Sequence, residues 1–276
     1  MNIQRPIFAL VLAVSLAAMA WPASAQLTEQ IPPPRQKWSF AGPFGKYDEA
    51  QLQRGFKIYR EVCANCHSME MLSFRNLADP GGPGFSEAQA EAVASEYKIK
   101  DLDDLGNPIE RAGRLADHFP SPFANELAAK ATYGVAPPDM STLAKARSYS
   151  RGFPLFVFDM VTQYQEQGPD YIAAYINGYK DAPNSFVLPE GGNYNEYFPG
   201  HNTAMPPPLQ DGQVTYDDGS PQTAQQYGKD VTAFLMWAAE PHLDARKRIG
   251  FQVMIFLIVL AGLMYFTKKK VWSAVH

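Results

Sequence analysis

The two cysteines of the chain lie in one pentapeptide, Cys63-Ala64-Asn65-Cys66-His67. A C-x-x-C-H pattern is typical of covalent c-type haem attachment, in which both thiols form thioethers and the histidine binds the iron. A thioredoxin-like redox pair would need a βαβ context, which the flanking residues do not supply. A structural zinc site would need a second pair of ligands, and the sequence has neither a second C-x-x-C nor an H-x₃₋₅-H. The pattern therefore predicts one haem on Cys63 and Cys66, with His67 as its proximal ligand.

An electron carrier with a six-coordinate haem also needs a second axial ligand, and a methionine thioether raises its reduction potential. Local chemistry favours Met205, because the three prolines that follow it fix the backbone. His201 would give a bis-histidine haem of lower potential, and on the residues alone it stays open. The other donors considered are Met140, which also follows prolines, Met160 and His118.

Composition and charge narrow the range of functions. Of the 276 residues 46% are hydrophobic and 19% are charged, as in an ordinary folded protein. The formal net charge is −4 and no basic stripe is visible, which argues against nucleic acid as a partner. The acidic patch of Asp101, Asp103 and Asp104 is expected to be a solvated face and not a docking site.

Both ends of the chain carry membrane signals. Residues 1–25 predict a secretory signal peptide, because Arg5 precedes an apolar run and an A-x-A cleavage site ends at Ala25. Residues 249–266 form an uncharged apolar run between two basic triplets, long enough to span a bilayer. Since both flanks are basic, orientation follows from the exported N-terminus. The expected organisation is a signal peptide over 1–25, a periplasmic domain over 26–245, a transmembrane anchor with basic flanks over 246–270 and a cytoplasmic tail over 271–276.

Between these ends the apolar periodicity predicts short helices joined by long loops. A helix that follows Asp48 has one apolar face and delivers Cys63 to the haem. Gly55 is costly inside this helix, and either the close approach of another helix or simple tolerance explains it. No run of alternating strands is visible, so the expected fold class is mainly α. Further helices are expected over 86–97, 127–133, 169–179 and 223–239, with another through 146–147.

The haem segment and several later blocks resemble the cytochrome c1 family, in its bacterial type. The similar blocks are RGFKIYREVCANCHSM at 54–69, DHFP at 117–120, APPDMS at 136–141, AR at 146–147, YFPG at 197–200, AMPP at 204–207 and WAAEP at 237–241. They stand in the order of the family and cover most of the chain. The resemblance implies a c-type cytochrome haem domain with long loop insertions and one C-terminal transmembrane helix.

The same resemblance implies one covalently bound haem c and assigns its contacts. The implied thioethers are Cys63 and Cys66, and the implied axial iron ligands are His67 and Met205. The resemblance also places Arg147 near a haem propionate and Pro138 in packing contact with the haem. Some members of the family carry an extra disulfide, for which this chain has no cysteines. The segment 148–168 is longer than in mitochondrial relatives.

The function implied by the resemblance is that of an electron-transfer subunit of the quinol–cytochrome c reductase, or bc1, complex. Such a subunit carries electrons from the Rieske iron–sulfur protein to a cytochrome c, in a dimeric complex that also holds cytochrome b. Because quinol oxidation occurs on its partners, the chain is not expected to be catalytic on its own. Its expected location is the bacterial inner membrane, with the haem domain in the periplasm and the C-terminus in the cytoplasm.

Two other classes of protein remain as alternatives. A free-standing membrane-anchored electron shuttle would need only a small haem domain, and the long loops between residues 79 and 200 count against it. A haem enzyme such as a peroxidase would need an open or displaceable sixth position on the iron. Binding of carbon monoxide to the native haem distinguishes this enzyme from an electron carrier.

Overall fold

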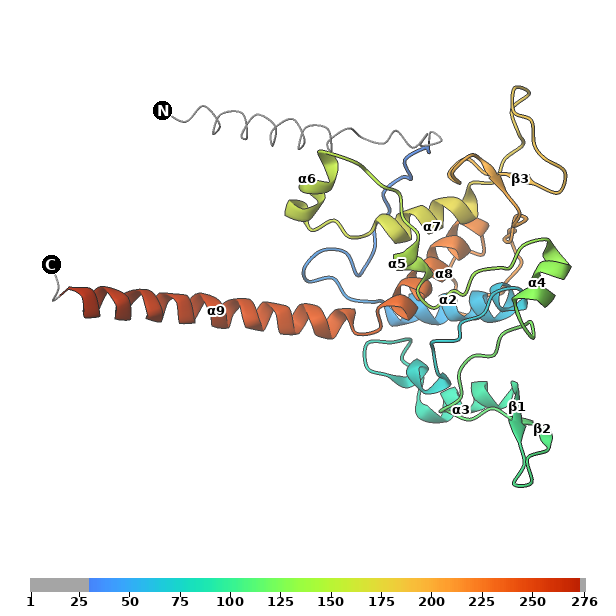
Figure 1. Ribbon diagram of the computed structural model, residues 1–276, viewed down its shortest axis with the longest axis horizontal. Coiled ribbons are helices and arrows are strands. Elements are labelled where there is room, and N and C mark those ends of the chain that lie inside the picture. Colours follow the sequence, from blue (N-terminus) through green and yellow to red (C-terminus); the bar gives the residue numbers. More distant parts are fainter. Residues whose placement is uncertain (1–29, 274–276) are drawn as a thin grey trace, which may run out of the picture.

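The computed structural model describes residues 30–273, which form a mainly helical domain and one long projecting helix (Figure 1). The expected signal peptide over 1–25 lies outside the described residues. The helices are α2 (Glu49–Glu61), α3 (Glu87–Ser95), α4 (Glu126–Tyr133), α5 (Leu143–Ala146), α6 (Leu155–Thr162), α7 (Gln167–Asn177), α8 (Ala224–Ala239) and α9 (Leu243–Trp272), with 3₁₀ turns η1 (Cys63–Asn65) and η2 (Phe74–Ala78). This confirms the mainly α class and each helix expected from the sequence, with ends shifted by a few residues.

Two small antiparallel hairpins complete the fold. Strands β1 (Lys98–Leu102) and β2 (Pro108–Ala112) pair with Lys98 opposite Ala112. Strands β3 (Asn193–Tyr194) and β4 (Asn202–Thr203) form the second hairpin. The sequence did not predict either one, because the first is charged on both faces and the second is only two residues long on each side.

The first hairpin gives the acidic patch a structural role. Asp101 in β1 binds Arg111 in β2 at 2.5 Å, and Arg111 also binds Asp117 at 2.6 Å. Asp103 accepts hydrogen bonds from the turn between the strands. The expected solvated face is confirmed for Asp104, which is exposed. For Asp101 and Asp103 the expectation was incomplete, since both also stabilise the hairpin.

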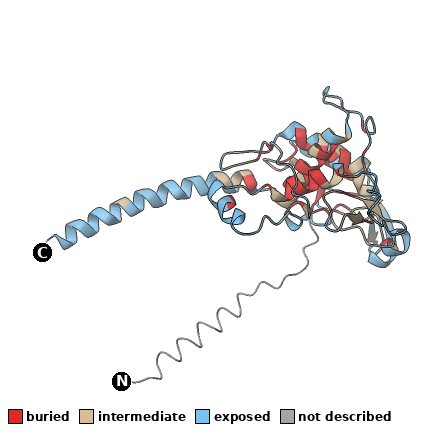
Figure 2. Cartoon of the chain, turned by 90° about the horizontal axis from the view of Figure 1, so that it is seen from above, coloured by how far each residue is buried: buried red, intermediate tan, exposed pale blue. Residues whose placement is uncertain are grey.

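Helices α2 and α8 cross in the centre of the domain (Figure 1), and Gly55 lies at a close approach between them. A Cβ atom at this position would lie 2.2 Å from the carbonyl oxygen of Asp230 and 2.7 Å from the Cβ of Phe234. Phe56 packs beside it against Phe234, with ring centroids 5.6 Å apart. Of the two explanations for Gly55, the structure supports the close approach of a second helix. Buried residues gather around this crossing (Figure 2).

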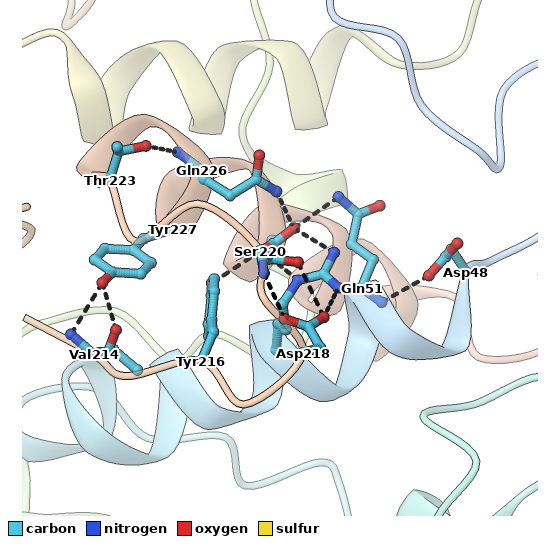
Figure 3. A network of polar contacts seen from close by, with 11 residues as sticks. Asp48, Gln51, Val214, Tyr216, Asp218, Ser220, Thr223, Gln226 and Tyr227 are labelled. Atoms are coloured by element: carbon cyan, nitrogen blue, oxygen red, sulfur yellow. Dashed lines mark hydrogen bonds and ion pairs between the residues drawn. The ribbon is translucent and has the colours of Figure 1, made fainter. Parts of the chain in front are cut away.

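A buried carboxylate fixes how the two helices are rotated against each other. Asp230 on α8 is fully buried, and it accepts hydrogen bonds from four side chains (Figure 3). These donors are Gln51 and Arg54 on α2, Tyr216 in the preceding loop and Gln226 on α8. Because a buried charge is costly unless it is paired, α2 is held in the rotation that keeps these bonds. The direction in which the C-terminal end of α2 points is thereby set.

The chain leaves the domain through α9, directly after α8 ends at Ala239. In the described part of the chain, α9 is the one helix that is long and apolar enough to cross a membrane, and none of its most apolar stretch is buried. Its 30 residues span about 45 Å at ~1.5 Å per residue, against about 30 Å for the hydrocarbon core of a bilayer. The helix therefore contains the expected anchor and extends it by some residues at each end.

Candidate functional site

The two cysteines lie just past the end of α2. Asp48 caps the start of this helix by accepting a hydrogen bond from the Gln51 backbone. The helix ends at Glu61, and Cys63 opens the turn η1. The expectation that α2 itself carries Cys63 is therefore wrong by two residues, because the backbone tightens into a 3₁₀ turn there. The carbonyl oxygen of Cys63 accepts from the backbone nitrogens of both Cys66 and His67, so the whole pentapeptide is compact.

Both thiols are free and half-buried. Burial raises the pKa of the Cys63 thiol to about 12. The Cys66 Sγ atom lies 3.2 Å from the hydroxyl of Tyr133, at the end of α4. This hydrogen bond raises the pKa of Tyr133. Sequence reasoning did not find Tyr133, because a single tyrosine at a helix end carries no motif.

One contact fixes the orientation of the His67 ring. Its Nδ1 atom lies 2.8 Å from the carbonyl oxygen of Pro138. A carbonyl oxygen only accepts, so Nδ1 carries the proton and Nε2 keeps a lone pair with which it can bind a metal. Burial lowers the pKa of His67, although the Pro138 carbonyl and Asp139 oppose this. The neutral, iron-binding form of the imidazole is therefore favoured.

Asp139 holds the loop that contains Pro138. Its carboxylate accepts hydrogen bonds, each 2.8 Å long, from Ser68 Oγ and from the backbone nitrogens of Glu70 and Ser141. Burial alone would raise the pKa of Asp139, but these donors hold it below its ordinary value. The loop at 136–141 and the segment after His67 thus form one braced unit. The sequence contains Asp139 within a family block, but it does not reveal this contact.

Met205 lies in the loop after β4 and is half-buried. Its backbone nitrogen donates to Thr203 Oγ1 at 3.4 Å, and that hydroxyl is 2.8 Å from the hydroxyl of Tyr175 on α7. Within residues 30–273 no hydrogen bond joins this loop to the turn of Cys63–His67. The pairing of Met205 with His67 across an iron therefore stays a prediction.

His201 and Met140, two alternative axial ligands, each make contacts with other residues. His201 stacks on Tyr194 with ring centroids 5.4 Å apart, and its Nδ1 lies 3.1 Å from the Asn195 carbonyl oxygen. Met140 is buried, and its backbone donates to Ser68 at 2.8 Å. Because it follows Pro138 by two residues, it belongs to the side of the site that holds His67.

The two remaining candidates lie on other elements. Met160 is 68% exposed on α6. His118 borders a surface cavity of about 460 Å³ between the first hairpin and residues 116–124. Neither this cavity nor a smaller one at the base of α9 is lined by the two cysteines, His67 or Met205. These positions give no support to Met160 or His118 as an axial ligand.

Arg147 and Pro138 are expected to contact the haem without binding its iron or forming a thioether, and both are exposed. Arg147 directly follows α5, and within the described residues its side chain makes neither a hydrogen bond nor an ion pair. An exposed guanidinium with no partner in that part of the chain is suited to an anionic group such as a propionate. Pro138 contributes its carbonyl to His67, which is a role that the sequence did not predict.

The donor set fits a covalently bound haem. Two free thiols lie on one compact turn, and the adjoining histidine is held with Nε2 available. Among residues 30–273 no group of three or more His, Cys, Asp or Glu side chains could hold a metal ion by itself. The residues present therefore match the needs of a haem better than those of a bare metal ion.

Comparison with known proteins agrees with this chemistry. A model described as the Cytochrome C1 family matches residues 38–275. "Cytochrome b/c1" of Bradyrhizobium diazoefficiens is 64% identical over 247 residues, which cover 88% of this chain and 36% of that protein. The chain thus spans about a third of that longer relative. "Cytochrome c1" of Blastochloris viridis is 50% identical over 274 residues, covering 98% of this chain and 96% of the relative. "Cytochrome c1" of Rhodospirillum rubrum is 43% identical over 244 residues, covering 87% of this chain and 88% of the relative.

Proposed function

The chain belongs to the cytochrome c1 family, of bacterial type, and on this premise we propose that it is the haem-carrying electron-transfer subunit of a cytochrome bc1 complex. The observation that carries the proposal is the contact of His67 Nδ1 with the Pro138 carbonyl, directly after C-x-x-C. A histidine held in this way presents Nε2 as an iron ligand beside the two thiols. The family implies haem c as the cofactor.

Four residues bind the haem in this proposal. Cys63 and Cys66 would form its thioethers, and His67 and Met205 would be the ligands of its iron. The bound haem supplies a centre that takes up and releases one electron. The Met205 thioether favours the ferrous state and so raises the potential. The Pro138 carbonyl keeps the His67 ring in one tautomer.

Two further residues act at the edge of the haem. Arg147 pairs with a propionate through its exposed guanidinium, which places a positive charge beside an anionic group. Pro138 packs against the haem in addition to orienting His67. Both roles concern binding and orientation, and the chain is not itself catalytic in quinol oxidation.

The proposed partners are the other subunits of the complex and its electron acceptor. The chain accepts electrons from a Rieske iron–sulfur protein and donates them to a cytochrome c, within a dimeric assembly that includes cytochrome b. The name of the Bradyrhizobium relative, which joins b and c1, supports cytochrome b as a partner. An axial methionine gives a potential suited to accepting from a Rieske centre, at roughly −150 to +300 mV.

The proposed location is the bacterial inner membrane. The helix α9 is a single anchor, and its length and composition support this role. The signal peptide at 1–25 exports the N-terminal side, so the haem domain over 26–245 lies in the periplasm. The anchor with its basic flanks over 246–270 then leaves residues 271–276 in the cytoplasm.

A reduced-minus-oxidised spectrum tests this function. The chain is purified through a C-terminal tag in mild detergent, and its haems are counted by type. We expect haem c together with haem b, both reducible by quinol. Haem c alone, from a preparation that retains other membrane complexes, would favour a free-standing shuttle. Binding of carbon monoxide to the native haem c would favour a haem enzyme.

A further inference from the structure

The short helix α6 presents its apolar side chains outward and its one acidic side chain inward. Asp159 is only 6% exposed. Arg35 and Arg151 both pair with it on the inner side of the helix. A helix that faces water shows the reverse arrangement. The outward apolar residues are Leu155 (42% exposed), Phe156 (50%), Val157 (42%), Phe158 (60%), Met160 (68%) and Val161 (77%), with Phe153 (82%) just before them.

Polar contacts on the inner side hold α6 in this orientation. The guanidinium of Arg35 lies 4.0 Å from the centre of the Tyr164 ring, just after the helix. The Tyr164 hydroxyl donates to Asp170, a fully buried carboxylate at the start of α7. Asp170 also accepts from the Trp38 indole at 2.8 Å. Since the helix is tied to the core through Asp159 and the residues that follow it, its apolar side chains point outward.

Helix α6 lies on the side of the domain from which α9 leaves, level with the first turns of that helix (Figure 1). Glu166, in the linker after α6, borders one small cavity together with Arg246 and Lys247 at the start of α9. Phe44, in a loop tied to this linker by a bond from Gly42 to Glu166, is 71% exposed. Its ring packs edge-on against Phe251 of α9, with centroids 5.4 Å apart. The surface of α6 is thus continuous with the surface around the base of α9.

The chemistry of the α6 face fits lipid better than protein. Protein interfaces carry roughly one hydrogen bond per 100–200 Å² and a polar rim. Thr162 is the one exposed polar side chain of α6, and its hydroxyl already donates to the Phe158 carbonyl. Lipid chains accept a face that offers no hydrogen-bonding group, while nearby exposed cations suit the headgroups. The exposed Lys37, two residues after Arg35, is such a cation.

We propose that α6 is a second membrane contact, which lies in the interface beside α9 with its apolar face against lipid. This inference rests on the proposed role of α9 as the anchor. A single helix leaves the domain free to turn about the membrane normal. A second contact at α6 restricts that rotation and sets the tilt of the haem-binding face. The segment 148–168, whose role could not be predicted from the sequence, thereby orients the domain.

Electron paramagnetic resonance accessibility tests this contact in the intact membrane assembly. Single cysteines are introduced as Phe158→Cys and, in a second variant, Val161→Cys, and each is spin-labelled. The assembly is reconstituted in liposomes with its haems held reduced, and the signal of the labelled parent assembly is subtracted. Val187→Cys, at a loop residue that is 90% exposed, serves as the water control. Ile258→Cys on α9 serves as the lipid control.

We expect labels at 158 and 161 to collide several-fold more with oxygen, relative to a water-soluble nickel chelate, than the label at 187 does. A ratio at 158 and 161 equal to that at 187 would overturn the contact, since it would place α6 in water. Low collision with both reagents would also overturn it, because another protein surface would then cover the helix. If the collision ratio at 258 equalled that at 187, α9 would lie in water. The proposed role of α9 as the anchor would then be contradicted, and the contact of α6 with it.

Discussion

The two loops proposed to bracket the haem iron are held in different ways. The loop after His67 is joined to the loop at 136–141 by short polar contacts, among them those of Pro138 and Asp139. The loop with Met205 has one long backbone bond to Thr203, and otherwise relies on the stiffness of its prolines. Polar contacts depend on particular side chains, whereas proline stiffness belongs to the backbone. Substitutions on the His67 side should therefore affect haem retention and stability, and substitution of Met205 should mainly affect potential.

The largest effect is expected at the cysteines. Cys63→Ser or Cys66→Ser removes one thioether. Each variant should therefore yield much less haem-loaded protein and show an altered haemochrome spectrum. The measurement is the haem content that survives acid–acetone extraction, together with the pyridine haemochrome spectrum. Met205→Leu is the matched control, because it should keep both thioethers. Unchanged content and spectrum in the serine variants would contradict covalent attachment at these positions.

The next largest effect is expected at the helix crossing that positions the cysteine turn. In Gly55→Ala the new methyl group would meet the Asp230 carbonyl at 2.2 Å. Overpacking of this kind costs roughly 1–3 kcal/mol, so the denaturant midpoint of the haem domain should fall. Gly250→Ala in α9 is the control, because nothing lies within 4 Å of its added atom. Equal midpoints for the two variants would show that the crossing tolerates a side chain.

A smaller effect is expected at Asp139, and it sharpens the contrast between the two loops. Asp139→Asn removes the charge from three hydrogen bonds but keeps one acceptor oxygen. We expect a loss of about 1 kcal/mol in unfolding free energy and little change in potential. Asp104→Asn, at an exposed position, is the control for loss of charge alone. A large shift in potential with unchanged stability would reverse the roles assigned to the loops.

The smallest effect is expected in acid, at the ion pair between Arg111 and Asp117 beside the first hairpin. Hydrogen bonds from Arg111 hold the pKa of Asp117 at about 2, below its ordinary value. A carboxylate with a lowered folded-state pKa stabilises the fold above its unfolded pKa, near ~3.9, and this contribution is lost as pH falls toward the folded value. The unfolding midpoint of the parent should therefore drop between about pH 4 and pH 2.

Asp117→Asn should flatten this pH dependence, by up to about 1 kcal/mol for a pair at the surface. The measurement is the unfolding midpoint of parent and variant across the same pH range. The haem potential at neutral pH should be the same in both, since in the described residues no hydrogen bond or ion pair joins the hairpin to either loop. Parallel pH profiles for the two proteins would remove Asp117 as a source of acid sensitivity.

Local pattern was sufficient for much of the scaffold. The cap at Asp48 and the apolar face of α2 follow from helical periodicity, and so does α8. The pentapeptide predicted the cysteines and His67 as the haem-binding turn without any fold. The resemblance to a family predicted that Pro138 lies near the haem, and this position stays a prediction. These features depend on residues close together in sequence, or on blocks that recur as a unit.

The remaining features depend on contacts that no local pattern encodes. His67 and Pro138 are 71 residues apart, as are Ser68 and Asp139, so their bonds required the folded chain. Helix α6 was missed because its apolar run surrounds a single Asp159 and shows no polar face. The first hairpin was missed because neither strand alternates apolar with polar residues. Its stability comes instead from Arg111 and its carboxylate partners.

Potentiometric titration of Met205→Leu beside Met140→Leu tests the central claim most directly. Both variants should keep their thioethers and His67, so a change in potential reports the second axial ligand. Axial ligands set haem potentials over roughly 0.8 V, and we expect Met205→Leu to lower the potential by a sizeable fraction of that range. Met140→Leu should leave it nearly unchanged. An unchanged potential in Met205→Leu would contradict the account, and a fall confined to Met140→Leu would transfer the ligand to the loop that holds His67.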